Sequence, residues 1–69
     1  MATLKELRLE AQLSVNRLAQ LAKVDRQTID RAENGQAVQD VKAYAIVQTL
    51  AQQLGRKITL QDVEGLNIL

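Results

Sequence analysis

Residues 13–35 read LSVNRLAQLAKVDRQTIDRAENG, and this stretch decides the fold because it carries the pattern of two short helices joined by a tight turn. Ser14 and Asp25 are residue types that favour the cap position at a helix start. Gly35 tolerates the left-handed backbone found at helix ends. Apolar residues recur at helical spacing between these signals: Leu18, Ala19 and Ala22 in the first helix, and Ile29 and Ala32 in the second.

The second helix, expected over residues 25–34, has one apolar side and one polar side. At about 100° of rotation per residue, Ile29 and Ala32 lie roughly 60° apart, and the opposite arc of about 140° is polar. That arc holds four side chains that can all hydrogen-bond: Arg26, Gln27, Asp30 and Arg31. Base pairs in the DNA major groove differ in their donor and acceptor groups, so this side of the helix suits base reading. An ordinary solvated helix side has the same composition, and the pattern alone leaves both interpretations open.

A wider set of residues matches one known sequence pattern. The set comprises Leu18-Ala19, Ala22, Val24, Ile29 and Glu33-Asn34-Gly35 within the stretch, and residues 4–8, Leu50-Ala51 and Leu54-Gly55 outside it. Through these residues the chain resembles the phage repressor and Cro family of helix-turn-helix proteins, the Xre-like transcriptional regulators. The resemblance implies an all-α fold: a compact five-helix, lambda-repressor-like DNA-binding domain with its helix-turn-helix motif at residues 14–35.

Local signals place the other helices. Two pairs of residues have the spacing of a capping box, Thr3 with Glu6 and Thr59 with Asp62. The first pair predicts a helix start near the beginning of the chain, and the second predicts a short fifth helix over about residues 59–64. The fourth helix is expected over about residues 41–54, where one apolar stripe recurs at helical spacing.

The resemblance implies sequence-specific binding of double-stranded DNA by a prokaryotic or phage transcriptional regulator, in this family most often a repressor. The expected base contacts are Arg26, Gln27 and Arg31, since arginine can bond guanine in two places and glutamine can bond adenine. The expected phosphate contacts, which position without specifying sequence, are Asn16, Arg17, Lys23, Thr28, Asn34, Gln36 and Lys42. Asp30 can either accept a bond from cytosine or hold Arg26 one helical turn away, and we favour the second role.

Three positions depart from the family pattern. Arg17 stands where family members often carry an acidic residue, and a cation in the first turn opposes the helix dipole unless a phosphate lies nearby. We therefore interpret Arg17 as a phosphate contact; the alternative is a solvated arginine. Lys23 stands where the family turn often has glycine, which costs on the order of 1 kcal/mol if the turn requires a positive backbone angle. Val15 replaces a polar residue and is expected to pack inward.

Composition restricts the function classes. The 69 residues suffice for a single domain, 1–69. The sequence contains no cysteine and no histidine, so we expect no enzymatic activity, no metal site and no cofactor. Tyr44 is the sole aromatic residue, which gives little material for stacking on unpaired bases. The net charge is +1, and no apolar run approaches the ~20 residues of a membrane span, so we expect a soluble, cytoplasmic protein without membrane contact.

The apolar end of the chain has two interpretations. Leu66, Ile68 and Leu69 either fold back onto the core or meet a second copy. We favour a homodimer, because members of the family that the chain resembles commonly dimerise through this end and a two-fold dimer matches two DNA half-sites. A rival function is a protein-interaction module, such as an antitoxin or anti-repressor on the same fold, binding a protein partner that the sequence does not identify. The near-neutral charge, Val15 and the apolar end favour this rival.

Overall fold

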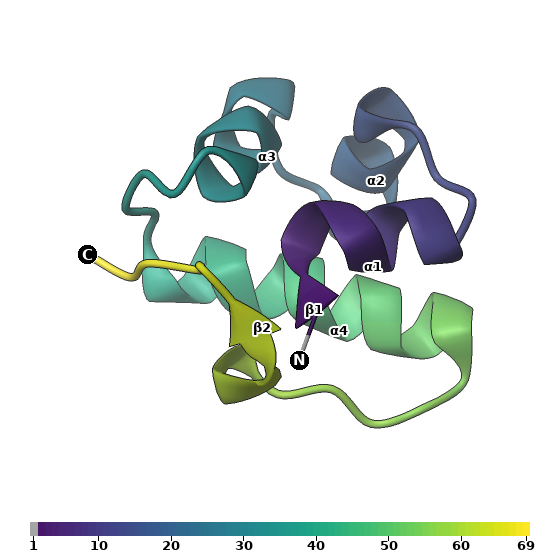
Figure 1. The fold of residues 1–69 in the computed structure, drawn as a ribbon. Coiled ribbons are helices and arrows are strands. Elements are labelled where there is room, and N and C mark those ends of the chain that lie inside the picture. The colour runs from purple at the N-terminus through teal and green to yellow at the C-terminus, as the bar shows by residue number, and fades with distance from the viewer. Residues whose placement is uncertain (1) are drawn as a thin grey trace.

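The computed structural model describes residues 2–69 and contains four α-helices, one 3₁₀ helix and two short strands. In chain order the elements are β1 (Ala2–Thr3), α1 (Leu4–Glu10), α2 (Val15–Ala22), α3 (Arg26–Glu33), α4 (Asp40–Leu54), η1 (Leu60–Asp62) and β2 (Val63–Glu64). Helices α2 and α3 form the upper part of Figure 1, with α1 crossing below them and the long α4 beneath. After η1 the chain returns past β1 as the strand β2, and its last residues continue toward the loop between α3 and α4 (Figure 1).

The first helix begins as its sequence predicts. The Thr3 backbone N–H donates to Glu6 Oε1 at 2.8 Å, and the Glu6 N–H donates to Thr3 Oγ1 at 3.2 Å, which completes the capping box. The Thr3 backbone N–H, which bonds to the Glu6 carboxylate, and the Thr3 hydroxyl hold the pKa of the Glu6 carboxyl below its ordinary value. Each bond satisfies a polar group that the helix itself leaves without a partner, and so fixes where α1 starts.

The core lies between α4 and the other helices. Its largest fully buried side chains come from α2, α3 and α4: Leu18, Ile29, Ile46, Val47 and Leu50. Ala19, Ala22 and Ala32 are also buried, which confirms the apolar positions predicted for the motif. Val15 packs against the edge of this core, as expected for a residue that turns away from solvent. The motif therefore rests on α4 through its apolar side and leaves its polar side outward.

The expectation of an all-α, five-helix domain is wrong in one place. Residues 59–64 form only the single 3₁₀ turn η1 and then the strand β2, which pairs in parallel with β1 in the register Ala2 to Val63 and Thr3 to Glu64. The Thr59 N–H still donates to the Asp62 carboxylate at 2.9 Å, as the capping-box spacing predicts. One turn is too short to commit the chain to an α-helix, and pairing with β1 extends the backbone from Val63 onward.

The last residues fold back onto their own chain. The Val38 N–H donates to the Asn67 carbonyl at 3.0 Å, and the Leu69 N–H donates to the Val38 carbonyl at 2.9 Å. The Asn67 side-chain amide donates to the Gly35 carbonyl at 2.6 Å. Leu66 packs against the core, whereas the side chains of Ile68 and Leu69 remain exposed. The backbone thus follows the fold-back alternative, and two of the three apolar side chains stay at the surface.

Two further features bear on function. None of the helices within residues 2–69 combines the length and the apolar character that crossing a bilayer requires. The same residues bring together no group of three or more acidic, histidine or cysteine side chains that could hold a metal ion.

Candidate nucleic-acid interface

The turn between α2 and α3 takes the conformation that the sequence analysis allowed for. Ser14 Oγ accepts the Arg17 N–H at 3.0 Å and caps α2 at its start. At the other end Lys23 adopts φ 60° and ψ 41°, and its N–H bonds back to the Gln20 carbonyl. This is the left-handed region in which a side chain is strained by roughly 1 kcal/mol. The turn therefore does demand a positive angle, and Lys23 occupies it in place of glycine.

A buried ion pair fixes α3 from its inner side. Arg8 Nε donates to Glu33 Oε2 at 2.6 Å, with a second, longer bond from Nη2 to Oε1 at 3.4 Å. Arg8 Nη1 also donates to the Leu13 carbonyl at 3.0 Å, and both charged side chains are only 10% exposed. The pair joins α1 to the end of α3 and so sets the orientation of the motif on the bundle. The sequence analysis missed it; the available signal was an arginine between Leu4 and Ala11 on the apolar side of α1.

The outer face of α3, which we define as Arg26, Gln27, Asp30 and Arg31, is directed away from the core. Ile29 and Ala32 are 0% and 3% exposed on the inner side, while the three predicted base-contact residues of the outer face are exposed. The geometric prediction of a polar arc opposite Ile29 and Ala32 is confirmed. Arg26 Nε lies 3.8 Å from Asp30 Oδ2, which is the one-turn pairing expected for Asp30.

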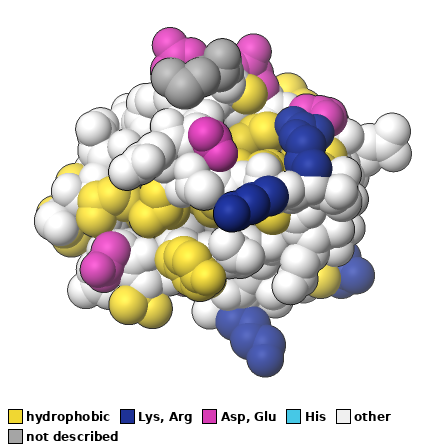
Figure 2. All heavy atoms as spheres, turned by 90° about the horizontal axis from the view of Figure 1, so that it is seen from below, with side chains coloured by type: hydrophobic (Ala, Val, Ile, Leu, Met, Phe, Trp, Pro, Cys, Tyr) yellow, Lys and Arg dark blue, Asp and Glu magenta, His cyan; other side chains and the backbone are white. Residues whose placement is uncertain are grey.

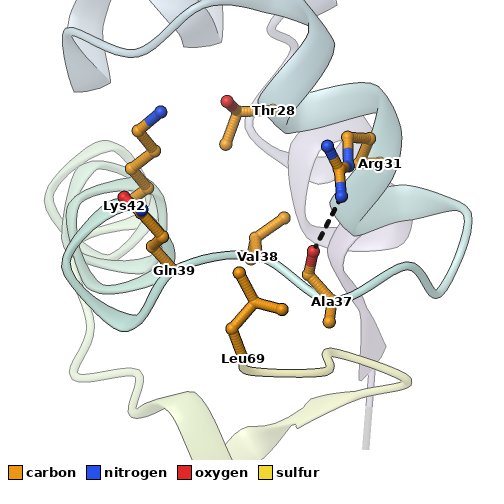
Figure 3. Close-up of a pocket in the computed structure, with 7 residues that line it drawn as sticks. All are labelled: Thr28, Arg31, Ala37, Val38, Gln39, Lys42 and Leu69. Atoms are coloured by element: carbon orange, nitrogen blue, oxygen red, sulfur yellow. Dashed lines mark hydrogen bonds between the residues drawn. The ribbon is translucent and has the colours of Figure 1, made fainter.

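Arg31 borders a small pocket between α3 and the start of α4. Its Nη2 donates to the Ala37 carbonyl at 3.5 Å, so the side chain bends toward the α3–α4 loop (Figure 3). The pocket measures about 160 Å³ and is also lined by Lys42, whose ammonium group points toward Thr28 across it (Figure 3). Two cations from different elements thus approach one hollow beside the outer face of α3.

Thr28 differs from the other predicted phosphate contacts. It is 7% exposed, and its hydroxyl donates to the Asp25 carboxylate. This bond holds the pKa of the Asp25 carboxyl below its ordinary value. Asp25 occupies the cap position predicted for it, but its side chain bonds to the Thr28 hydroxyl instead of capping the helix backbone. The Thr28 hydroxyl proton is therefore already used in a hydrogen bond within the molecule.

The remaining predicted phosphate contacts line the rim of the motif. Asn16, Arg17, Lys23, Asn34 and Gln36 are exposed, and Lys42 is half-buried. Arg17 has no acidic partner within 4 Å among residues 2–69, and its Nη1 donates to Gln20 Oε1 at 3.4 Å. Polar and basic side chains therefore flank the outer face of α3, both on the side of α2 and on the side of the loop between α3 and α4.

Comparison with known proteins adds one finding. A family model described as a helix-turn-helix domain matches residues 2–62, which span β1 to η1 and include both motif helices. The comparisons with curated proteins and with solved structures found no match.

Proposed function

Because this chain belongs to the helix-turn-helix domain family of Xre- and Cro-like regulators, we propose that it binds specific double-stranded DNA sequences through the major groove and acts as a transcriptional repressor. The observation that carries the proposal is the outer face of α3. Three exposed side chains that can read base edges stand opposite the buried Ile29 and Ala32, on a helix fixed from behind by an ion pair.

Each side chain has a proposed role. Gln27 and Arg31 read bases, and Arg26 reads a base while Asp30 restrains its guanidinium. The rim residues Asn16, Arg17, Lys23, Asn34, Gln36 and Lys42 contact phosphates and fix the register on the duplex. Thr28 joins them if its hydroxyl proton turns from Asp25 to a phosphate oxygen, because a phosphate only accepts hydrogen bonds.

The proposed DNA-bound form is a cytoplasmic homodimer. A two-fold dimer presents two copies of α3 to successive major grooves, as the docking of phage repressors illustrates. The net charge of +1 supports the same view, because a nearly neutral domain gains little from non-specific attraction and needs two correctly placed half-sites. The exposed Ile68 and Leu69 side chains are candidates for the dimer contact.

The test is selection of bound sites from random duplex DNA by the intact protein and by two variants. Arg31→Ala removes a proposed base contact, and Arg56→Ala is its matched control, since it removes the same charge far from the motif. We expect a recurring site for the wild type and for Arg56→Ala. For Arg31→Ala we expect a roughly 10- to 100-fold loss of discrimination at one base position. Enrichment of no sequence by the wild type would refute the proposal and favour the protein-interaction module.

A further inference from the structure

Residues 67–69, which we call the strap, are bonded to the loop that connects α3 to α4. The Val38 N–H donates to the Asn67 carbonyl at 3.0 Å, and the Leu69 N–H donates to the Val38 carbonyl at 2.9 Å. The Asn67 side-chain amide reaches the other end of the loop and donates to the Gly35 carbonyl at 2.6 Å. The family match ends at residue 62, so the strap lies beyond the part of the chain that the match covers.

The strap restrains the loop at two places. Val38 is only 4% exposed, so its side chain already anchors the loop in the core near the start of α4. Gly35 ends α3 with φ 80°, and glycine has the most backbone freedom of all residues, which the bond from Asn67 limits. Gln36 and Ala37 lie between these two restrained residues, so the strap also fixes the direction of the Ala37 carbonyl.

The Ala37 carbonyl in turn restrains Arg31. Arg31 Nη2 donates to this carbonyl at 3.5 Å, and the Arg31 side chain has no other hydrogen bond and no ion pair among residues 2–69. Figure 3 shows the guanidinium directed from α3 toward the Ala37 carbonyl, with Val38 and Leu69 on the same side of the pocket. One long bond at the surface restrains a side chain only while its acceptor stays in place. The loop therefore decides how the Arg31 guanidinium is oriented in the free protein.

We propose that Asn67 is a positioning residue for the base contact assigned to Arg31, and that it acts through the loop without touching DNA. Fixing a long side chain on binding costs conformational entropy, and a side chain that is already restrained loses less. The strap keeps the Ala37 carbonyl where it orders the Arg31 guanidinium beforehand, which strengthens binding. The inference rests on the proposed DNA-binding function and adds a residue to the same site.

The test is a double-mutant cycle of the intact protein on the duplex that the wild type selects, measured by fluorescence anisotropy. Asn67→Ala removes the amide donor and should weaken binding about two- to tenfold, the range for ordering one long side chain. In the Arg31→Ala background the same change should have no further effect, because Asn67 acts through Arg31. Additive losses would indicate a direct contact or a general loosening of the fold and would overturn the proposal. Binding by Asn67→Ala that equals or exceeds that of the wild type would also overturn it.

The η1 side of the molecule supplies the matched control. Figure 2 shows this side, where hydrophobic side chains form several exposed patches with single acidic and basic side chains between them. Two open hollows of about 320 and 370 Å³ lie beside Tyr44, and the exposed Gln61 lines the larger one. No residue of α2, of α3 or of the strap lines either hollow. Gln61→Ala thus removes a side-chain amide far from the loop, and it should bind DNA like the wild type.

Amide hydrogen exchange tests the strap without DNA. The Val38 N–H is hydrogen-bonded to the strap and should exchange slowly in the wild type. Asn67→Ala should speed its exchange about two- to tenfold, as the loss of one hydrogen bond predicts. Exchange at the buried Leu50 of α4 should stay unchanged, which shows that the fold is retained.

The two measurements separate failure of this inference from failure of the DNA-binding proposal. Equal exchange at Val38 in the wild type and in Asn67→Ala would overturn the strap, whatever the DNA result. If the wild type selects no duplex although Val38 responds as expected, the DNA-binding proposal fails, and the role of Asn67 in base contact fails with it.

Discussion

Helix α3 carries an ion pair on each of its two sides, and the two pairs differ in almost every respect. On the inner side Arg8 and Glu33 are bonded at 2.6 Å with both side chains 10% exposed. On the outer side Arg26 and Asp30 lie 3.8 Å apart with side chains 63% and 50% exposed. The inner pair joins residues 25 positions apart and is shielded from water, whereas the outer pair spans one helical turn in water.

This difference shows how one short helix can be held firmly on its inner side while the side chains of its outer side stay free to rearrange. Charges removed from water are costly to leave unpaired, so the inner pair restrains α3 strongly once it forms. Exposed charges interact weakly and rearrange at little cost, so the outer pair can open when a base or phosphate offers a better partner. Stability is thus concentrated on one side of α3, and the proposed DNA recognition is on the other.

The largest effect is expected from breaking the inner pair. Glu33→Ala leaves the Arg8 guanidinium buried without its carboxylate, which should lower the free energy of unfolding by about 3–5 kcal/mol. Urea denaturation followed by circular dichroism measures this change. The control is the double variant Arg8→Met with Glu33→Leu, which replaces the pair by apolar side chains and should restore most of the loss. A loss below about 1 kcal/mol for Glu33→Ala would show that the pair does not hold α3.

Replacing Lys23 in the turn between α2 and α3 should have a smaller effect. The free energy of unfolding should rise, whereas the salt dependence of DNA binding should fall. Lys23→Gly relieves the left-handed strain, for a net gain of about 0.5–1 kcal/mol in stability after the added chain entropy of glycine. It also removes a proposed phosphate contact, so the salt dependence of DNA binding should fall by roughly 0.9 in log–log slope. Gln12→Gly, at the other non-glycine residue with φ 60°, should give the gain in stability without the change in slope. Equal slopes for both variants would remove Lys23 from the interface.

The outer pair should matter little to stability. Asp30→Asn is expected to change the free energy of unfolding by less than about 0.5 kcal/mol, as for exposed pairs one turn apart. If the proposed function is right, it should also raise overall affinity for duplex DNA, because it removes a negative charge from the proposed binding face, and weaken the preference at the base assigned to Arg26. Site selection with the variant measures both. Unchanged preference at every position would show that Asp30 does not restrain Arg26.

The smallest expected change concerns the carboxyl group of Asp25. The Thr28 hydroxyl lowers the pKa of this group in the folded protein, so the bond contributes stability above the ordinary value of 3.8 and loses it as pH falls through the lower folded value. Thr28→Val removes the donor and should return the pKa of Asp25 toward 3.8, measured by NMR titration of the side-chain carbon. A pKa that stayed low in the variant would show that another group stabilises the carboxylate.

Local signals predicted the helices well because caps and apolar spacing act over a few residues. Thr3 with Glu6 and Ser14 before α2 mark helix starts that the structure reproduces. The buried and exposed sides of α3 also follow directly from its 3.6-residue period. The expected fourth helix, over about residues 41–54, agrees with α4 to within one residue at its start.

Features that depend on distant residues could not be read in the same way. The Arg8–Glu33 pair joins positions 25 apart, and only an arginine on an apolar side hinted at it. The capping box at Thr59 predicted a turn correctly but could not reveal that Val63 pairs with Ala2 at the other end of the chain. The two hollows beside Tyr44 arise where η1 meets α4, so the sequence showed Tyr44 only at the margin of an apolar stripe.

The most direct test of the central claim, that the outer face of α3 reads duplex DNA, is a salt series of binding constants. Fluorescence anisotropy would compare the wild type on its selected duplex and on a scrambled duplex of equal length. We expect log K to fall with log salt by about 0.9 for each phosphate contact on both duplexes, with the selected duplex bound more tightly at every salt concentration. Equal affinity for the two duplexes throughout, or binding that does not respond to salt, would contradict the account.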